Sequence, residues 1–282
     1  MRLAIASGKG GTGKTTLSVA IAKSVDGRVK LLDCDVEEPN SHIFLDIQEK
    51  KVTDVTVSVP VIDEAKCTLC AKCAQFCQFN AIISLAEATT MVFKDLCHSC
   101  GGCMLICPEK AITETQEVTG ELMKADVGNI EFFEGKLSVG KAMSPPVIRA
   151  VLSSVKDENG LIVIDSPPGT SCPMITAVSG VDHVLLVTEP TPFGLNDLKI
   201  AVETVRGLGI PFSVAINRYD CGDDGVEKYC KTQGIDISLK IPDSTKVAVA
   251  YSKGVSLDLS MPKIKKDIRR FLKSIESAGR KN

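Results

Sequence analysis

The feature that most constrains this chain is a glycine-rich stretch near its beginning, between two apolar segments. Leu3–Ala6 predicts a strand and Leu17–Ala22 predicts a helix. The stretch between them, Gly8–Thr15, fits the pattern G-x-x-x-x-G-K-[ST]. In such a loop the backbone N–H groups and the N-terminus of the following helix hold a polyphosphate. We therefore expect the chain to bind a nucleoside triphosphate.

The residue types within this loop have separate tasks. Lys14 would reach the β- and γ-phosphates, and the Thr15 hydroxyl would ligate Mg²⁺. The residues that we expect to contact the phosphates are Gly10, Gly11, Thr12, Gly13, Lys14, Thr15 and Thr16.

Two later apolar runs end in acidic residues. Val29–Leu32 is followed by Asp33 and Asp35, and Leu161–Ile164 is followed by Asp165. Continuous apolar runs of this length are typical of strands buried on both faces of a parallel sheet. Ligands bind at the carboxyl ends of such strands, so these carboxylates should face the nucleotide, with Asp165 holding Mg²⁺. The predicted fold is α/β, a doubly wound and mainly parallel P-loop sheet.

Eight of the 12 cysteines form two copies of the spacing C-x₂-C-x₂-C-x₃-C. This is bacterial ferredoxin spacing, in which three close thiolates bind one [4Fe–4S] cluster and the fourth binds the other cluster. One predicted ligand set is Cys67, Cys70, Cys73 and Cys107. The second is Cys97, Cys100, Cys103 and Cys77. A zinc site remains the alternative, although zinc sites normally use cysteine pairs and not triplets.

A second lysine in the loop narrows the class. With Lys9, the loop reads K-G-G-T-G-K-T and resembles the loop of the MinD/ParA/Mrp family. The resemblance implies that Lys9 acts across a dimer on the partner's nucleotide and that Asp35 positions the attacking water. It also implies that Asn217 and Arg218 frame the adenine of ATP and that Asp243 lies on a second loop beside the base.

The chain is thus identified as a member of the MinD superfamily with an inserted ferredoxin-like domain. Residues 1–60 and 116–282 resemble the ATPase domain, and residues 61–115 resemble an α+β ferredoxin with two clusters. The resemblance implies Mg²⁺-dependent ATP hydrolysis with Lys9, Lys14 and Asp35 as catalytic residues. It implies a nucleotide-dependent homodimer, or a heterodimer with a paralogue.

Two complete cluster motifs favour coupling of ATP-driven dimer closure to electron transfer, or to assembly of an iron–sulfur or other metal cofactor on a protein partner. The alternative is an ATPase that positions cellular cargo, as MinD and ParA do, with clusters that only hold the insert folded. A ferredoxin with a vestigial ATPase is disfavoured because the phosphate and Mg²⁺ ligands are all present.

Composition excludes several other classes. A net charge of −2, 4% aromatic residues and no Trp argue against nucleic-acid binding. Clustered cysteines beside a nucleotide motif indicate a reducing compartment, so we expect a cytoplasmic protein. The basic, amphipathic segment Pro262–Ala278 could lie on a membrane, but we expect its apolar stripe to pack on the sheet. Cys172 has the offset from Asp165 at which the nitrogenase iron protein carries a cluster ligand, although a small buried thiol is the favoured interpretation.

Overall fold

The computed structural model describes the whole chain except residues 86–87, 156–159 and 280–282. Its strands are β1 (Arg2–Ala6), β2 (Val29–Asp33), β3 (Lys51–Ile62), β4 (Ile82–Leu85), β5 (Thr89–Val92), β6 (Ile112–Val127), β7 (Ile130–Leu137), β8 (Leu161–Asp165), β9 (His183–Thr188), β10 (Phe212–Asn217) and β11 (Ile237–Ile241). Its α-helices are α1 (Lys14–Ser24), α2 (Lys72–Phe76), α3 (Gly102–Ile106), α4 (Pro145–Ser153), α5 (Cys172–Val178), α6 (Pro192–Gly207), α7 (Gly225–Gln233), α8 (Thr245–Tyr251), α9 (Leu257–Ser260) and α10 (Ile264–Gly279). Two short 3₁₀ helices are η1 (Ser41–Phe44) and η2 (Lys94–Leu96).

The main sheet has the strand order β11-β10-β9-β1-β8-β2-β7-β6-β3. Each neighbouring pair from β11 to β7 is parallel. Strands β1, β2, β8 and β9 are almost wholly buried, which explains their continuous apolar sequences. The expected α/β, mainly parallel sheet is confirmed.

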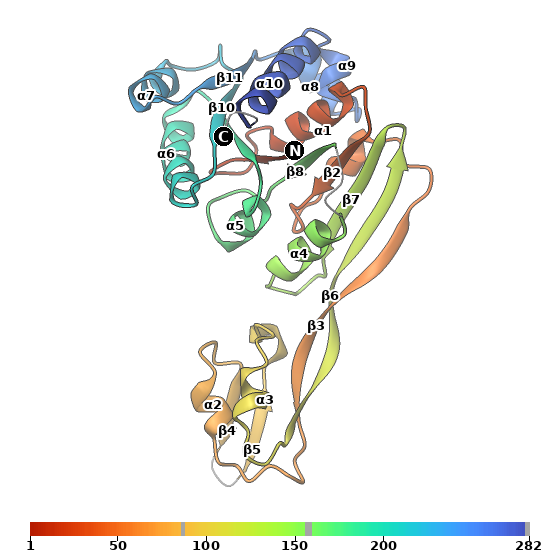
Figure 1. Cartoon of the computed structure of the whole chain (residues 1–282), viewed down its shortest axis with the longest axis vertical. Coiled ribbons are helices and arrows are strands. Elements are labelled where there is room, and N and C mark those ends of the chain that lie inside the picture. The colour runs from red at the N-terminus through yellow and green to blue at the C-terminus, as the bar shows by residue number, and fades with distance from the viewer. Residues whose placement is uncertain (86–87, 156–159, 280–282) are drawn as a thin grey trace. The chain divides into compact units, whose positions relative to one another are not determined.

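Helices cover both faces of this sheet, with α1 and α10 on one face and α5 and α6 on the other (Figure 1). The α1 face contains a continuous core in which Leu17 and Ile21 pack with Leu3, Leu31 and Val163 of the strands. Two oppositely facing apolar layers fix the register of the strands, and therefore the positions at which they end.

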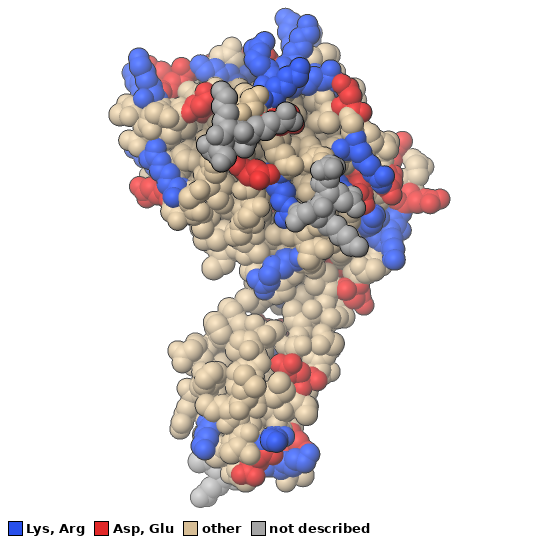
Figure 2. All heavy atoms as spheres, in the orientation of Figure 1, with Lys and Arg blue, Asp and Glu red and all other residues tan. Residues whose placement is uncertain are grey.

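Helix α10 contributes its apolar stripe to this core, as expected. Ile264, Ile268 and Phe271 are at most 3% exposed. The Lys and Arg side chains of the helix lie on its outer side, where Figure 2 shows a concentration of positive charge. Among the described residues, none of the helices combines the length and apolar character needed to cross a bilayer.

The chain divides into two compact units. The nucleotide unit comprises residues 1–52, 122–136 and 148–282, and the cysteine unit comprises residues 53–121 and 137–147. Strands β3 and β6 each contribute residues to both units. Strands β6 and β7 are joined by Gly128 and Asn129. The bounds 61–115 for an inserted domain remain a prediction.

The cysteine unit repeats one backbone pattern. Left-handed conformations occur at Leu69 and Ser99, at Ala71 and Gly101, and at Asn80 and Lys110. The two residues of each pair have the same offset from the first cysteine of their motif, before or after the five-residue helices α2 and α3. Strands β4 and β5 form a separate antiparallel hairpin. The duplicated sequence motif therefore folds into a duplicated local structure.

Candidate functional site

The phosphate-binding loop joins the end of β1 to the start of α1. Gly11 and Gly13 adopt positive φ angles of 77° and 94°. A side chain at Gly13 would also be obstructed, because its Cβ would lie 2.6 Å from Asn217 Nδ2. No side chain caps the first turn of α1, so its backbone N–H groups are available to an anion.

Asn217, at the end of β10, fixes this loop from across the sheet. Its Nδ2 donates to the Thr12 carbonyl oxygen at 2.9 Å, and its Oδ1 accepts from the Arg218 amide at 3.1 Å. Arg218 itself has a positive φ of 52°. Asn217 thus supports the shape of the loop, while its expected contact with adenine remains a prediction.

A cavity of about 400 Å³ opens at the carboxyl edge of the sheet beside this loop. Most of the predicted nucleotide ligands line it, namely Gly10, Gly11, Gly13, Lys14, Thr15, Thr16, Asp35, Asn217, Arg218 and Asp243. Thr12 does not line the cavity, because this loop residue is buried and only 2% exposed. Val247, Ala248 and Tyr251 of α8 complete the wall. The arrangement suits a nucleotide with its phosphates at the start of α1.

Asp165 lies in the buried end of β8, behind the loop. Its Oδ1 accepts a hydrogen bond from Ser18 Oγ at 3.0 Å, and its Oδ2 has no hydrogen-bond partner among the described residues. Burial, and secondarily the charge of Asp33, raise the pKa of Asp165 to about 8. A buried carboxylate with a free oxygen beside a phosphate site fits Mg²⁺, which favours oxygen ligands. Thr15 and Asp165 would hold that ion.

Asp33 and Asp35 have different environments. Asp33 is fully buried, and it accepts the backbone amides of Asp35, Asn40 and Ser41 at 3.1, 3.2 and 3.0 Å. Asp35 borders the nucleotide cavity. Burial raises the pKa of Asp35 to about 7, against the opposing effect of Lys14. Asp33 therefore braces the loop, and Asp35 is the carboxylate available to a water molecule.

The second lysine of the loop has a partner within its own chain. Lys9 Nζ lies 3.7 Å from Glu189 Oε2. The other oxygen of Glu189 accepts from Arg218 at 3.1 Å, and Arg218 also lies 3.6 Å from Asp243. Glu189 thus holds Lys9 and Arg218 at one rim of the site. The action of Lys9 on a partner's nucleotide remains a prediction.

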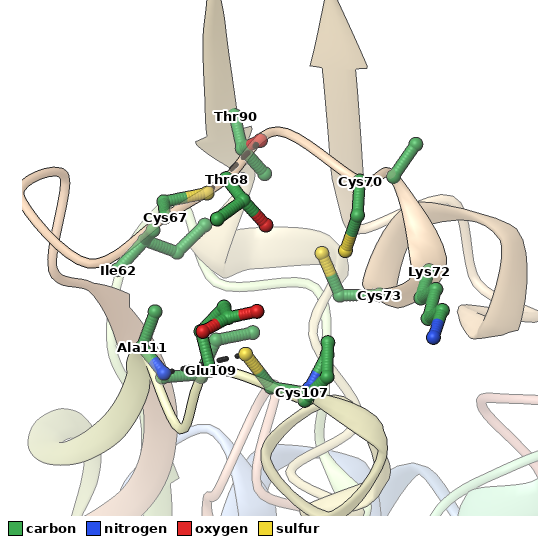
Figure 3. Close-up of a pocket in the computed structure, with 13 residues that line it drawn as sticks. Ile62, Cys67, Thr68, Cys70, Lys72, Cys73, Thr90, Cys107, Glu109 and Ala111 are labelled. Atoms are coloured by element: carbon green, nitrogen blue, oxygen red, sulfur yellow. Dashed lines mark hydrogen bonds between the residues drawn. The ribbon is translucent and has the colours of Figure 1, made fainter.

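The cysteine unit contains two cavities with crossed sets of cysteines. One cavity is lined by Cys67, Cys70, Cys73 and Cys107. The other is lined by Cys77, Cys97, Cys100 and Cys103. In Figure 3 the four sulfur atoms of the first set point toward a common space. Each motif therefore contributes three cysteines to one cavity and its fourth cysteine to the other.

Backbone amides point at three of these sulfur atoms. Ala81 N lies 3.3 Å from Cys77 Sγ, Ala111 N lies 3.3 Å from Cys107 Sγ and Ser99 N lies 3.4 Å from Cys97 Sγ. Such donors stabilise thiolate ligands. Within the described part of the chain, no three Cys, His, Asp or Glu side chains converge closely enough to hold a single metal ion. Four thiols around each cavity are the donor type that an iron–sulfur cluster requires, and the clusters themselves remain a prediction.

The remaining cysteines do not join these sets. Cys34 and Cys230 are buried, and Cys221 is exposed. Cys172 begins α5 and is exposed, so the expectation of a small buried thiol is wrong at this position. The sequence offset from Asp165 does not reveal whether this first residue of α5 is covered.

Sequence reasoning missed several residues around the nucleotide site. Ser18, Glu189 and the hydrogen-bonded pair of His42 and Glu134 (Nδ1 to Oε2, 2.7 Å) were not singled out. Ser18 could have been found because it follows Lys14 by one helical turn. The other contacts join residues far apart in sequence, and no local pattern predicts them.

Fold and loop together define a P-loop nucleotide-binding protein. The profile of the family described as the CobQ/CobB/MinD/ParA nucleotide binding domain matches residues 3–257. The chain belongs to this family of P-loop ATPases.

Two relatives illustrate its place in the family. An uncharacterized protein of Methanocaldococcus jannaschii, MJ0579, is 30% identical over 91% of this chain and 91% of its own length. An iron-sulfur cluster carrier protein of Pyrococcus abyssi is 22% identical over 92% of this chain and 79% of its own length.

Solved structures show the same fold. The cell division ATPase MinD of Pyrococcus furiosus has a TM-score of 0.59 at 19% identity, covering 97% of this chain and 98% of that one. The septum site-determining protein MinD of Pyrococcus horikoshii, complexed with Mg-ADP, has a TM-score of 0.55 at 20% identity, covering 98% and 95%. A MinC:MinD cell division protein complex of Aquifex aeolicus contains a chain with a TM-score of 0.56 at 18% identity, and the match covers 96% of this chain and 95% of that one.

Proposed function

We propose that this protein hydrolyses ATP and binds two [4Fe–4S] clusters, and that its nucleotide state controls electron transfer to a protein partner or assembly of a metal cofactor on it. The observation that carries this proposal is the pair of four-cysteine cavities in a chain that also gathers its predicted phosphate ligands around a nucleotide-sized cavity. When bound, such clusters supply one-electron transfer. The name of the iron-sulfur carrier relative is in keeping with this proposal.

The nucleotide chemistry follows from the geometry of the site. The start of α1 and Lys14 bind the phosphates, while Thr15 and Asp165 hold Mg²⁺. Asp35 orients the attacking water by accepting a hydrogen bond, which requires its ionised form. The positive charge of Lys14 favours that form.

A dimer completes the site in this proposal. Lys9 leaves Glu189 and adds positive charge to the phosphoryl group on the partner's nucleotide, as an arginine finger does. Dimer closure then presents the cysteine unit to the protein partner. The face of this unit shown in Figure 2 carries mostly uncharged side chains, so docking there would depend little on charge.

The test is electron paramagnetic resonance of the anaerobically purified, dithionite-reduced protein, with ADP and then with a slowly hydrolysed ATP analogue. A shift in the cluster signals or in their midpoint potentials with the analogue is expected. The same sample's electron transfer to an acceptor should be faster with ATP than with ADP. Equal spectra and equal rates would contradict nucleotide control, and absence of iron would contradict the clusters.

The crossed cysteine sets allow a sharper test of the clusters themselves. Cys77→Ser should remove the same paramagnetic centre as Cys100→Ser, although Cys77 belongs to the other motif. Cys70→Ser should remove the second centre and leave the first. Each variant should retain about half of the iron and sulfide. Loss of the Cys67-motif centre in Cys77→Ser would contradict the crossed ligation.

The alternative, a cargo-positioning ATPase with structural clusters, has the MinD and ParA folds in its favour. However, the apolar stripe of α10 is buried in the core and is not available to a membrane. ATP-dependent binding of the whole protein to liposomes would favour this alternative over the proposal.

A further inference from the structure

The segment from Cys34 to Phe44 carries Asp35 along the edge of the nucleotide cavity. Asp35, Glu38 and Asn40 line the cavity, and the segment closes with η1. Phe44, at the end of η1, is 4% exposed and packs in the core, so that end is anchored. The conformation between these ends decides where the Asp35 carboxylate lies.

The first set of hydrogen bonds that fixes this segment comes from Asp33, at the end of β2. Asp33 accepts the amides of Asn40 and Ser41, which draws the segment back toward the strand from which it departs. This contact is local, because both sides belong to residues 33–41. It cannot communicate the state of any other element.

A second contact that fixes this segment comes from Glu134 of β7. Glu134 Oε2 lies 2.7 Å from His42 Nδ1, on the residue next to Ser41. Glu134 is the register partner of Asp33 in the β2·β7 pair, so the two acidic residues are direct neighbours across adjacent strands, which Figure 1 shows side by side. The Glu134 side chain is only 8% exposed, whereas that of His42 is 44% exposed. A nearly buried carboxylate thus has a half-exposed partner on the segment that also carries Asp35.

The position of β7 in the chain gives this contact its significance. Strand β6 begins at Ile112, shortly after Cys107, and Gly128 and Asn129 connect it to β7. From Leu137, the last residue of β7, to residue 147 the chain belongs to the cysteine unit again. The strand that bears Glu134 is therefore bounded in sequence by the cysteine unit on both sides.

We infer that the Glu134–His42 pair positions the segment that carries Asp35, and that β7 thereby sets the rate of the hydrolytic step. This inference rests on the ATP hydrolysis proposed above. His42 and Glu134 are positioning residues, because neither lines the nucleotide cavity. A shift of β7 would move the Asp35 carboxylate relative to the attacking water without altering the phosphate-binding loop.

Strand β7 also supplies a matched control. Glu131 lies three residues earlier on the same strand and on its opposite face; its side chain is 12% exposed and pairs with Lys30 and Lys124. These partners lie on β2 and β6, not on the segment. Glu131→Gln removes the same charge from the same strand and leaves the hold on His42 intact.

Hydrogen exchange of the nucleotide-free and analogue-bound protein tests the positioning directly. In His42→Ala, and in Glu134→Gln to a smaller degree, the amides of residues 37–44 should exchange several-fold faster than in the wild-type protein. Exchange in the P-loop helix α1 should stay unchanged, and Glu131→Gln should match the wild type throughout. Wild-type exchange of residues 37–44 in His42→Ala would overturn the inference.

Steady-state ATP hydrolysis provides the functional readout. We expect kcat to fall about tenfold in His42→Ala with KM within twofold, since the loss of one charge-assisted hydrogen bond is of that order. The double variant His42→Ala/Glu134→Gln should lose no more than the single variant, because both remove one contact. A purely structural role would lower the melting temperature and leave kcat equal to that of Glu131→Gln.

The two failures are distinguishable. A wild-type protein that does not hydrolyse ATP but shows the expected exchange pattern contradicts the proposed function and leaves the positioning intact. A wild-type protein that hydrolyses ATP, with an unchanged kcat in His42→Ala, contradicts the inference alone.

Discussion

Asp33 and Asp35 are only two positions apart, yet the fold gives them different chemistry. The carboxylate oxygens of Asp33 accept hydrogen bonds from three backbone amides, whereas Asp35 borders the nucleotide cavity. Alternation along an extended chain places both side chains toward one face, so the sequence alone could not separate them beyond a resemblance. The backbone turn at the end of β2 decides between them.

Asp35→Asn should lower kcat for ATP hydrolysis by about 10²-fold, because an amide cannot accept a proton from water and orients it poorly. The dissociation constant of the ATP analogue should change less than threefold, since the phosphate ligands are untouched. Glu37→Gln, on the same segment but exposed and outside the cavity, is the control and should hydrolyse ATP normally. A wild-type rate in Asp35→Asn would assign the water to another residue.

His183 predicts how stability depends on pH. Burial lowers the pKa of His183 to about 4, and its Nε2 lies 2.9 Å from Ser213 Oγ. In the unfolded chain the pKa returns to about 6.5, so below that pH the unfolded state binds the extra proton. The free energy of unfolding should therefore fall as the pH decreases from 6.5 toward 4, by less than ~1.4 kcal/mol per pH unit from this residue.

Urea unfolding of the wild type and of His183→Gln between about pH 7.5 and 5.5 checks this slope. The variant should show a shallower decrease, with similar stability near pH 7.5. A slope identical to that of the wild type would mean that His183 is protonated in the folded protein.

At the scale of elements, the packing of α6 against the phosphate-binding loop depends on Gly8. A Cβ at this position would lie 2.3 Å from the Asp197 carbonyl oxygen of α6. A helix backbone cannot yield by this distance without moving, so Gly8→Ala should destabilise the protein by about 1–3 kcal/mol. At Gly10 an added Cβ meets nothing within 4 Å.

Thermal denaturation in the absence of nucleotide compares the two glycine variants. Gly8→Ala should melt several degrees below the wild type, and Gly10→Ala within a degree or two of it. Equal melting temperatures for both variants would show that α6 can shift away from the loop at little cost.

Local patterns predicted the elements that carry the motifs. The strand–loop–helix around Gly8–Thr15 agrees with its sequence signals. Strand β3 was missed, although Val55, Val57, Val59 and Val61 alternate as in a half-buried strand. Contacts such as Asn217 with Thr12 join residues 205 positions apart, and only the folded sheet brings them together.

For the molecule as a whole, the contact between Lys9 and Glu189 opposes dimer closure in the proposed function. Lys9 must leave Glu189 before it can reach another subunit, and Glu189 is also held by Arg218. The Glu189 side chain is 14% exposed, so its attraction for Lys9 is less screened than that of a surface pair. Dimer closure therefore requires free energy to break one Lys9–Glu189 contact in each subunit.

Glu189→Gln should remove that cost. We expect the dimer bound to a slowly hydrolysed ATP analogue to form at about three- to tenfold lower protein concentration, since two such contacts are released per dimer. Lys9→Ala should abolish the dimer, and Glu227→Gln, in an exposed pair with Lys240, should behave as the wild type. Analytical ultracentrifugation over a concentration series measures all three. If Glu189→Gln dimerises no more readily than Glu227→Gln, the Lys9–Glu189 contact does not restrain closure, and the position of Lys9 in the single chain has no bearing on assembly.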